Sequence, residues 1–326
     1  MDNFQKMSQR NRTSGMVESS ILLAIMMVLI IAGVYLPIIG GFAMLAQPGV
    51  LFLIMARQGM RWGVLATVAS FMLATILVGP LQALGLFLSS FLPGIIFAWL
   101  VYRKYSIAWV MLGSTFAFWL GMVAGVALSV LVMGMDISPE TIEAQMNGFI
   151  AVNPMYANMP PEQLAQAKAL IPLMAQMFLG ILGVFLLFIS MLMTYLNYWI
   201  TAYLARRFAQ IQLETFPPFY TWTFPKWLGT PFLIVMIAGY YAQFQQLIPP
   251  VWMINLGLGI CLISGFFMLL QGFAVFRFLF EAYRVPRFIF LILIIATFLL
   301  PVISITAIFT GIADLFLDYR KLKKKS

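Results

Sequence analysis

The chain has 326 residues, of which 63% are hydrophobic and only 9% are charged, and its mean hydropathy is +0.99. Soluble domains are close to half apolar and a quarter charged, so this composition excludes a water-soluble globule. The formal net charge of +9 is distributed in small basic clusters between apolar runs. This pattern is typical of the cytoplasmic loops of membrane proteins, and it argues against nucleic acid as a partner.

Nine apolar runs are long enough, or nearly long enough, to cross a bilayer, which takes about 20 helical residues. Since open strands cannot cross lipid, these runs predict an all-α, polytopic integral membrane bundle with eight or nine transmembrane helices. The runs cover residues 18–36, 38–56, 62–79, 81–102, 107–135, 171–205, 227–244, 251–280 and 288–312.

The basic clusters predict the orientation of the spans. A cytoplasmic N-terminus places the clusters of the first eight spans on the cytoplasmic side, as the positive-inside rule requires. The predicted organisation is a cytoplasmic segment, five membrane runs, an external connection, the remaining membrane helices and a basic tail. These parts cover residues 1–17, 18–135, 136–170, 171–312 and 313–326.

The ninth run does not fit this orientation, because a complete crossing would leave the basic tail outside. Three alternatives stay open: Pro301 breaks the run into a re-entrant piece, an earlier run does not cross, or the tail is translocated. The side of the C-terminus therefore stays open too.

The external connection contains two helix starts. Ser138 is a good N-cap, followed by Pro139 at the first helical position. Pro161 opens a second helix, which we expect to run on into the sixth span. Short helices over the outer face are predicted, as a solvated connector or as a lid.

A stripe of small residues marks one face of the fifth span. Small residues at every fourth position let a neighbouring backbone approach closely in a membrane, so the stripe predicts helix packing. Its members are Gly113, Ala117, Gly121, Gly125 and Ser129.

Polar side chains inside apolar runs are the candidate ligands for a solute, because each needs a partner in place of water. The candidates are Gln47, Gln82, Asn197 and Gln271. Pro48 interrupts the second run beside Gln47 and frees the carbonyl of Met44, which another group must satisfy. Interhelical hydrogen bonding is the alternative role for all four.

The sequence offers no chemistry for catalysis or for metal binding. It has no histidine, and Cys261 is its only cysteine, so a disulfide within the chain and a cysteine metal cluster are excluded. No nucleophile–base pair and no phosphate-binding loop are present. We therefore expect no catalytic residues, no metal site, no cofactor and no enzyme activity.

Three stretches resemble the YybS-like family of bacterial membrane proteins (domain of unknown function 2232). They are "LPIIGGFAMLAQPGVLFLIMARQGMRWGVLATVASFMLATILVGPLQAL", "QGFAVFRFLF" and "GIADLFLDYRKL". The resemblance covers most of the chain and implies a bacterial cytoplasmic membrane. It supplies no catalytic or binding residues.

Residues 15–205 are similar in plan to the S components of energy-coupling-factor transporters, which have six helices with the N-terminus inside. Ser20 and Ala24 match the small-residue spacing of the first helix in that family, whereas Val28 and the three additional C-terminal runs depart from it. Two functions follow as hypotheses. The first is binding or transport of a small solute between the helices, and the alternative is a scaffold that docks other membrane, envelope or cytoplasmic proteins.

Overall fold

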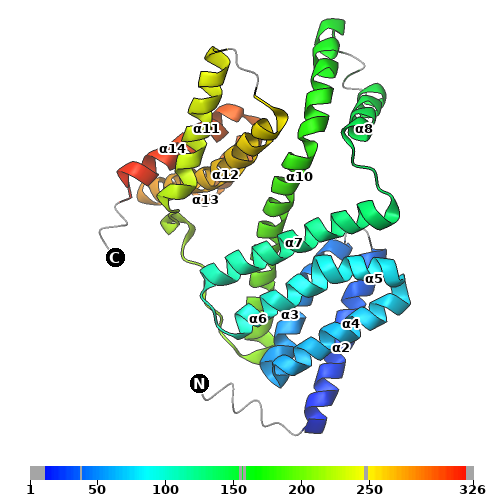
Figure 1. Cartoon of the computed structure of the whole chain (residues 1–326). Coiled ribbons are helices and arrows are strands. Elements are labelled where there is room, and N and C mark those ends of the chain that lie inside the picture. Colours follow the sequence, from blue (N-terminus) through cyan, green and yellow to red (C-terminus); the bar gives the residue numbers. More distant parts are fainter. Residues whose placement is uncertain (1–11, 37–38, 154–155, 157–158, 246–248, 321–326) are drawn as a thin grey trace. The chain divides into compact units, whose positions relative to one another are not determined.

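Every regular element in the described part of the chain is a helix (Figure 1). The structure, a computed structural model, describes residues 12–36, 39–153, 156, 159–245 and 249–320. The expected all-α membrane bundle is therefore confirmed. Most of the predicted segment 1–17 and the end of the predicted tail 313–326 lie outside these residues.

The predicted spans correspond to helices of suitable length and composition. Within the described ranges, seven helices are long and apolar enough to cross a membrane. A shorter apolar helix at Ser20–Tyr35 corresponds to the first run, and a bent helix pair corresponds to the ninth. By length and composition the described helices therefore give seven crossings, or eight if the bent pair is one span, and the expected eight or nine also require the shorter helix to cross.

The chain forms two compact units, which we describe separately. The N-terminal unit comprises Met1–Ile137 and Phe185–Thr215, and the C-terminal unit comprises Ser138–Val184 and Phe216–Ser326. The helix α10 (Pro161–Leu204) continues from one unit into the other, so it contributes its first part to the C-terminal unit and its last part to the N-terminal unit.

Within the described residues, the N-terminal unit contains nine helical elements. In chain order the elements before α10 are α2 (Arg12–Tyr35), α3 (Ile39–Gln58), α4 (Met60–Val78), α5 (Pro80–Leu86), the π-helix η1 (Phe87–Phe91), α6 (Leu92–Tyr102) and α7 (Ile107–Met133). They are followed by the last part of α10 and the π-helix η2 (Ala205–Ala209). The apolar run expected from residue 18 lies within α2.

Helix α3 is the central helix of the N-terminal unit. It contacts α2, α4, α6 and η2, and 72% of its apolar window is buried, whereas no other candidate span is buried by more than 33%. The helix runs without interruption through Pro48. A residue on α3 is therefore shielded from lipid on nearly every side.

Helix α4 of this unit presents small residues to the interior and large apolar residues outward. The buried face of α4 consists of Gly63, Ala66, Thr67, Ser70 and Ala74. Large side chains on the same helix are exposed, such as those of Met72 and Ile76. This arrangement suits a helix that is surrounded by lipid and packs closely on its neighbours.

The small-residue stripe of α7 faces α6 and η1. A Cβ atom added at Gly121 would collide with the carbonyl oxygen of Leu88 and would lie 2.8 Å from the Pro93 ring. Pro93 has no N–H to donate to a carbonyl of the preceding turn. The π-helix η1 lies in that turn, where the backbone hydrogen bonds join residues five apart instead of four. At Gly113 an added Cβ would lie 3.0 Å from Leu100 of α6.

The C-terminal unit begins with the connection that the sequence predicts to be external. Its elements are α8 (Pro139–Val152), the first part of α10, the 3-10 helix η3 (Phe219–Thr221), α11 (Lys226–Phe244), α12 (Val251–Ala282), α13 (Arg287–Leu299) and α14 (Pro301–Leu317). The hydroxyl of Ser138 accepts a hydrogen bond from the N–H of Thr141 at 3.3 Å, so the predicted N-cap of α8 is confirmed. The predicted start at Pro161 and its continuation into the sixth span are confirmed by α10.

Helices α12 and α14 cross with their backbones in contact. A Cβ added at Gly272 would collide with the carbonyl of Ala307, and one added at Gly311 would collide with the carbonyl of Met268. Such a close approach is possible only because both crossing points are glycines. This crossing is the core of the C-terminal unit, with Ile312 and Leu315 packed on Met268.

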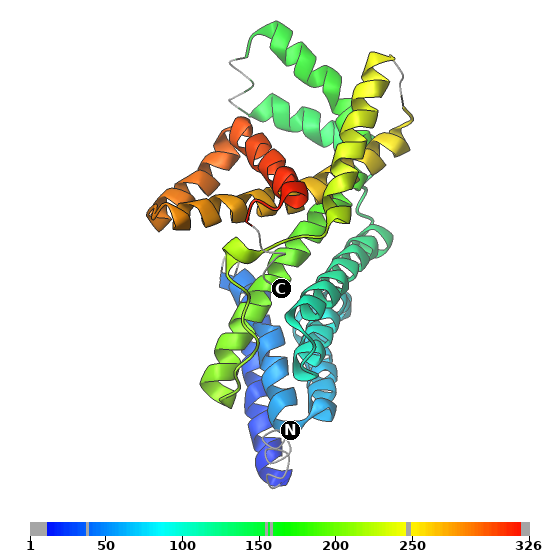
Figure 2. The same ribbon diagram turned by 90° about the vertical axis from the view of Figure 1, so that its left-hand side faces the viewer.

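The ninth apolar run is broken at Pro301, which is one of the three predicted alternatives. Helices α13 and α14 meet there at a bend of 110° (Figure 2). Helix α14 continues to Leu317, past the predicted boundary of the span at residue 312. The part of the chain predicted as a basic tail therefore starts within a helix, and Arg320 beyond it is buried.

Candidate functional site

Five uncharged polar side chains of the N-terminal unit are buried with polar atoms that have no hydrogen-bond partner. Both amide atoms of Gln47 lack one, as do the carbonyl oxygen of the Asn197 side chain and three hydroxyl groups. The hydroxyl groups belong to Ser114, Thr194 and Thr201. Gln47 is 1% exposed and Asn197 is 2% exposed. We call these five residues the buried polar set.

The members of the buried polar set come from three helices. Thr194, Asn197 and Thr201 are spaced three and four residues apart, so they share one face of α10. This face meets α3 at Gly49, where an added Cβ would lie 3.1 Å from the hydroxyl oxygen of Thr201. Gln47 precedes Gly49 by two residues, so it lies on the opposite face of α3, and Ser114 lies on α7.

The missing hydrogen bonds are costly in an apolar interior. A buried polar group without a partner costs about 1–3 kcal/mol, and the set contains several such groups. The Gln47 amide makes no hydrogen bond, so it does not satisfy the Met44 carbonyl that Pro48 leaves free. Groups left in this state in a folded protein call for an explanation beyond packing.

The other two predicted ligands lie elsewhere. Gln82 is exposed on α5 in the N-terminal unit. Gln271 belongs to the C-terminal unit, where it is buried on α12. The structure thus places Gln47 and Asn197 on two helices in contact, and it leaves Gln82 and Gln271 apart from them.

Gln271 has protein partners at both ends of its amide. Its nitrogen donates to the carboxylate of Asp314 at 2.6 Å, and its oxygen accepts from the N–H of Phe224 at 2.9 Å. Arg320 completes this group: its guanidinium pairs with Asp314 at 2.7 Å and donates to the carbonyls of Tyr220 and Trp222. We call Gln271, Asp314 and Arg320 the C-terminal latch, because they join α12, α14 and the segment before α11.

The sequence did not predict the latch or the three hydroxyl groups of the buried polar set. Serine and threonine occur often in apolar helices, so nothing in the pattern distinguished Thr194 or Thr201. Asp314 and Arg320 both fell within the predicted basic tail, 313–326. The available signal was an acidic residue inside an apolar run with an arginine six positions later.

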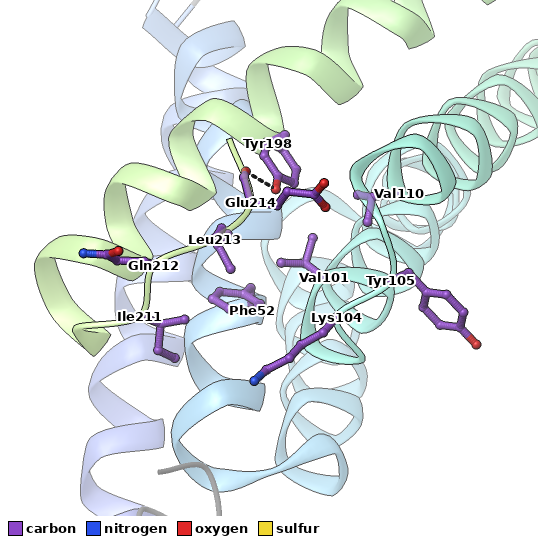
Figure 3. Close-up of a pocket in the computed structure, with 10 residues that line it drawn as sticks. All are labelled: Phe52, Val101, Lys104, Tyr105, Val110, Tyr198, Ile211, Gln212, Leu213 and Glu214. Carbon is purple, nitrogen blue, oxygen red and sulfur yellow. Dashed lines mark hydrogen bonds between the residues drawn. The ribbon is translucent and has the colours of Figure 1, made fainter. Parts of the chain in front are cut away.

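A cavity of about 260 Å³ opens at the end of the N-terminal unit where α6, α10 and η2 finish. Figure 3 shows its lining, which comes from α3, α6, α7, α10 and the segment after η2. The lining residues are Phe52, Val101, Lys104, Tyr105, Val110, Tyr198, Ile211, Gln212, Leu213 and Glu214. Apolar walls with a few polar groups are usual for a small-molecule site.

The segment after η2 is held against this cavity by hydrogen bonds. Tyr198 donates its hydroxyl proton to the carbonyl of Glu214 at 2.6 Å, as Figure 3 shows. The Glu214 carboxylate accepts from the N–H of Ile107 at 2.9 Å, at the start of α7. Nearby, the Arg57 guanidinium donates to the carbonyl of Phe208, which ties the end of α3 to η2.

The cavity and the buried polar set use the same two helices. Gln47 and Asn197 do not line the cavity, but Tyr198 follows Asn197 directly, and Phe52 lies five residues after Gln47. At 1.5 Å per residue, Gln47 is about 8 Å from Phe52 along α3. Phe52 and Tyr198 are both buried.

Among the residues that the structure describes, no three His, Cys, Asp or Glu side chains gather in a way that could hold a metal ion.

The comparisons with known proteins give one result. No curated protein matches the chain, and no solved structure matches it. A family described as "Predicted membrane protein (DUF2232)" matches residues 24–315. The chain therefore belongs to the DUF2232 family of membrane proteins, as its sequence motifs suggested.

Proposed function

We propose that the N-terminal unit binds a small, uncharged, polar solute between its helices, and that the protein carries this solute across a bacterial cytoplasmic membrane. The observation that supports this function best is the buried polar set. Its amide and hydroxyl groups are buried without partners, and Gln47 lies on the most enclosed span of the unit. A solute with its own donors and acceptors satisfies these groups and offsets their desolvation.

The residue types indicate the class of solute. The set contains one complete amide, one amide oxygen and three hydroxyl groups without partners, and none of its members is charged. An ionic solute would need a compensating charge in so apolar an environment. A neutral molecule with hydroxyl or amide groups fits better than an ion.

The cavity suggests how such a solute reaches the set. It lies at the ends of the helices that carry Arg57, Arg103 and Arg206, which we place on the cytoplasmic side by their charge. Movement of Phe52 and Tyr198 would join the cavity to the set. Rocking of the helices around a central site is the usual mechanism of membrane carriers.

Native mass spectrometry of the protein, purified in mild detergent, tests the proposal. We expect a small molecule at a stoichiometry of one with the unaltered protein, and its loss in Gln47→Leu and Asn197→Leu. The matched control is Gln82→Leu, an identical change at an exposed position, which should keep the ligand.

Two outcomes would contradict solute binding. If no small molecule accompanies the unaltered protein and Gln47→Leu only raises its melting temperature, the set is a packing defect. If other proteins accompany the chain instead, the scaffold function gains support.

A further inference from the structure

Helices α13 and α14 are each too short to cross a bilayer alone. With 13 and 17 residues, they are about 20 and 25 Å long, against a hydrocarbon core of about 30 Å. Together they could form one bent crossing or a hairpin that enters and leaves on the same side. The contacts at their two ends distinguish these possibilities.

The entering end of the pair lies beside the last turns of α12. The ring of Phe290, in the first turn of α13, is 6.1 Å from the ring of Phe280 and 6.3 Å from that of Phe273. The guanidinium of Arg277 lies 5.6 Å from the same ring. The ring of Phe219 in η3 is 6.2 Å away on another side.

The leaving end of the pair lies beside the same short helix and the start of α11. Near the end of α14, the ring of Phe316 is 5.6 Å from the ammonium nitrogen of Lys226, the first residue of α11. Arg320 then donates hydrogen bonds to the carbonyls of Tyr220, at 2.6 Å, and Trp222, at 2.9 Å. Residues 219–226 thus contact both ends of the pair.

Helices α11 and α12 are antiparallel neighbours, so the start of α11 and the end of α12 are on one side. An added Cβ at Gly265 would meet Phe232 at 3.2 Å, and one at Gly257 would meet Val235 at 3.4 Å. Phe232 precedes Val235 on α11, whereas its contact Gly265 follows Gly257 on α12, so the two helices run in opposite directions. The two ends of the α13–α14 pair are therefore on the side of Lys226.

We propose that residues 287–317 form a re-entrant hairpin, which enters the membrane and returns without crossing it. Its tip is the break at Leu300 and Pro301, where the helices meet at 110° (Figure 2). Eight helices then cross, and the two ends of the chain are on the same side. The C-terminal latch fastens the returning arm to α12 and to the segment before α11.

The hairpin removes the conflict between the last run and the positive-inside rule. Arg284, Arg287 and Arg320 all come to lie on the side of Lys226. A bent crossing would instead carry Arg320 to the opposite side, away from the carbonyls that it binds. The geometry and the charge distribution therefore favour the same topology.

Cysteine labelling tests the hairpin. In a Cys261→Ala background, one cysteine is introduced at a time by Tyr283→Cys, Tyr319→Cys or Val152→Cys, all at exposed positions. A membrane-impermeant maleimide is applied to intact cells and to inverted membrane vesicles. We expect Tyr283→Cys and Tyr319→Cys to react in the same preparation, and Val152→Cys to react in the other.

Labelling of Tyr319→Cys together with Val152→Cys would overturn the hairpin, because it would show a complete crossing. A fourth variant, Leu300→Cys, probes the tip: it should stay unlabelled until detergent is added. Reaction of Leu300→Cys in the preparation that labels Val152→Cys would also overturn the proposal. These readouts do not depend on a bound solute, so they can fail or succeed apart from the proposed function.

Discussion

Replacing Arg320 with alanine removes its contacts with three partners in the C-terminal unit at once. The Asp314 carboxylate loses its counter-charge and stays buried with one hydrogen bond from Gln271, while its second oxygen has no partner in the native protein either. The carbonyls of Tyr220 and Trp222 lose their donor. We therefore expect Arg320→Ala to destabilise this unit strongly.

The magnitude follows from the burial of the pair. The side chains of Arg320 and Asp314 are 0% and 2% exposed, and removing one partner of such a pair costs about 3–5 kcal/mol. For domains of 150–250 residues, 1 kcal/mol shifts the melting temperature by roughly 2–4 °C, so a fall of at least about 6 °C is expected. The assay is thermal unfolding in detergent, followed by circular dichroism.

Arg277→Ala is the matched control in the same unit. Arg277 pairs with Glu281 at 2.9 Å, but this pair is partly exposed and lies along one helix. Such pairs contribute about 0.3–0.5 kcal/mol, and the contact with the Phe290 ring adds about 0.5–1 kcal/mol. If Arg277→Ala and Arg320→Ala lowered the melting temperature equally, the assigned role of the latch would be refuted.

Three further changes test other contacts. Gly311→Leu should prevent the close crossing of α12 and α14, and therefore lower the yield of purified protein and its melting temperature. The control Gly239→Leu should change neither, because the glycine has open space around it. If both variants lowered the melting temperature equally, the close crossing would be contradicted. Ser138→Ala should cost about 1 kcal/mol at the start of α8, seen as faster amide exchange in that helix alone. Tyr198→Phe removes the hydroxyl that holds the segment after η2, so amide exchange in that segment should quicken while the helices stay protected. Unchanged exchange there would show that the other bonds hold the segment without it.

The sequence predicted most of the fold because the bilayer limits the choices. An apolar run of about 20 residues must be a helix, and its length sets its bounds within a few residues. The cap at Ser138 and the helix start at Pro161 could also be predicted, because each depends on only two or three adjacent residues. The ninth run was ambiguous because its length favoured a complete crossing, whereas the basic residues after it opposed one. The contacts with residues 219–226 distinguish the two topologies.

The candidate site could be predicted only in part. Gln47 and Asn197 stand out in the sequence because amides are rare in apolar runs. The hydroxyl of Thr201 does not, since threonine normally satisfies its hydroxyl within its own helix. The latch was beyond prediction for a different reason: the partners of Arg320 are backbone carbonyls about a hundred residues earlier, and no side-chain pattern marks them.

Hydrogen-bond satisfaction separates the two groups of buried polar residues in physical terms. In the C-terminal latch, the Gln271 amide and the Arg320 guanidinium have protein partners and hold segments together, and one oxygen of Asp314 is the latch atom without a partner. In the N-terminal unit, the Gln47 amide and the Thr201 hydroxyl are equally buried and have none. Folding gains nothing from leaving such groups unsatisfied at the centre of a membrane bundle. Because both groups occur in one chain and in the same solvent, the difference points to binding in the first unit and to structural support in the second.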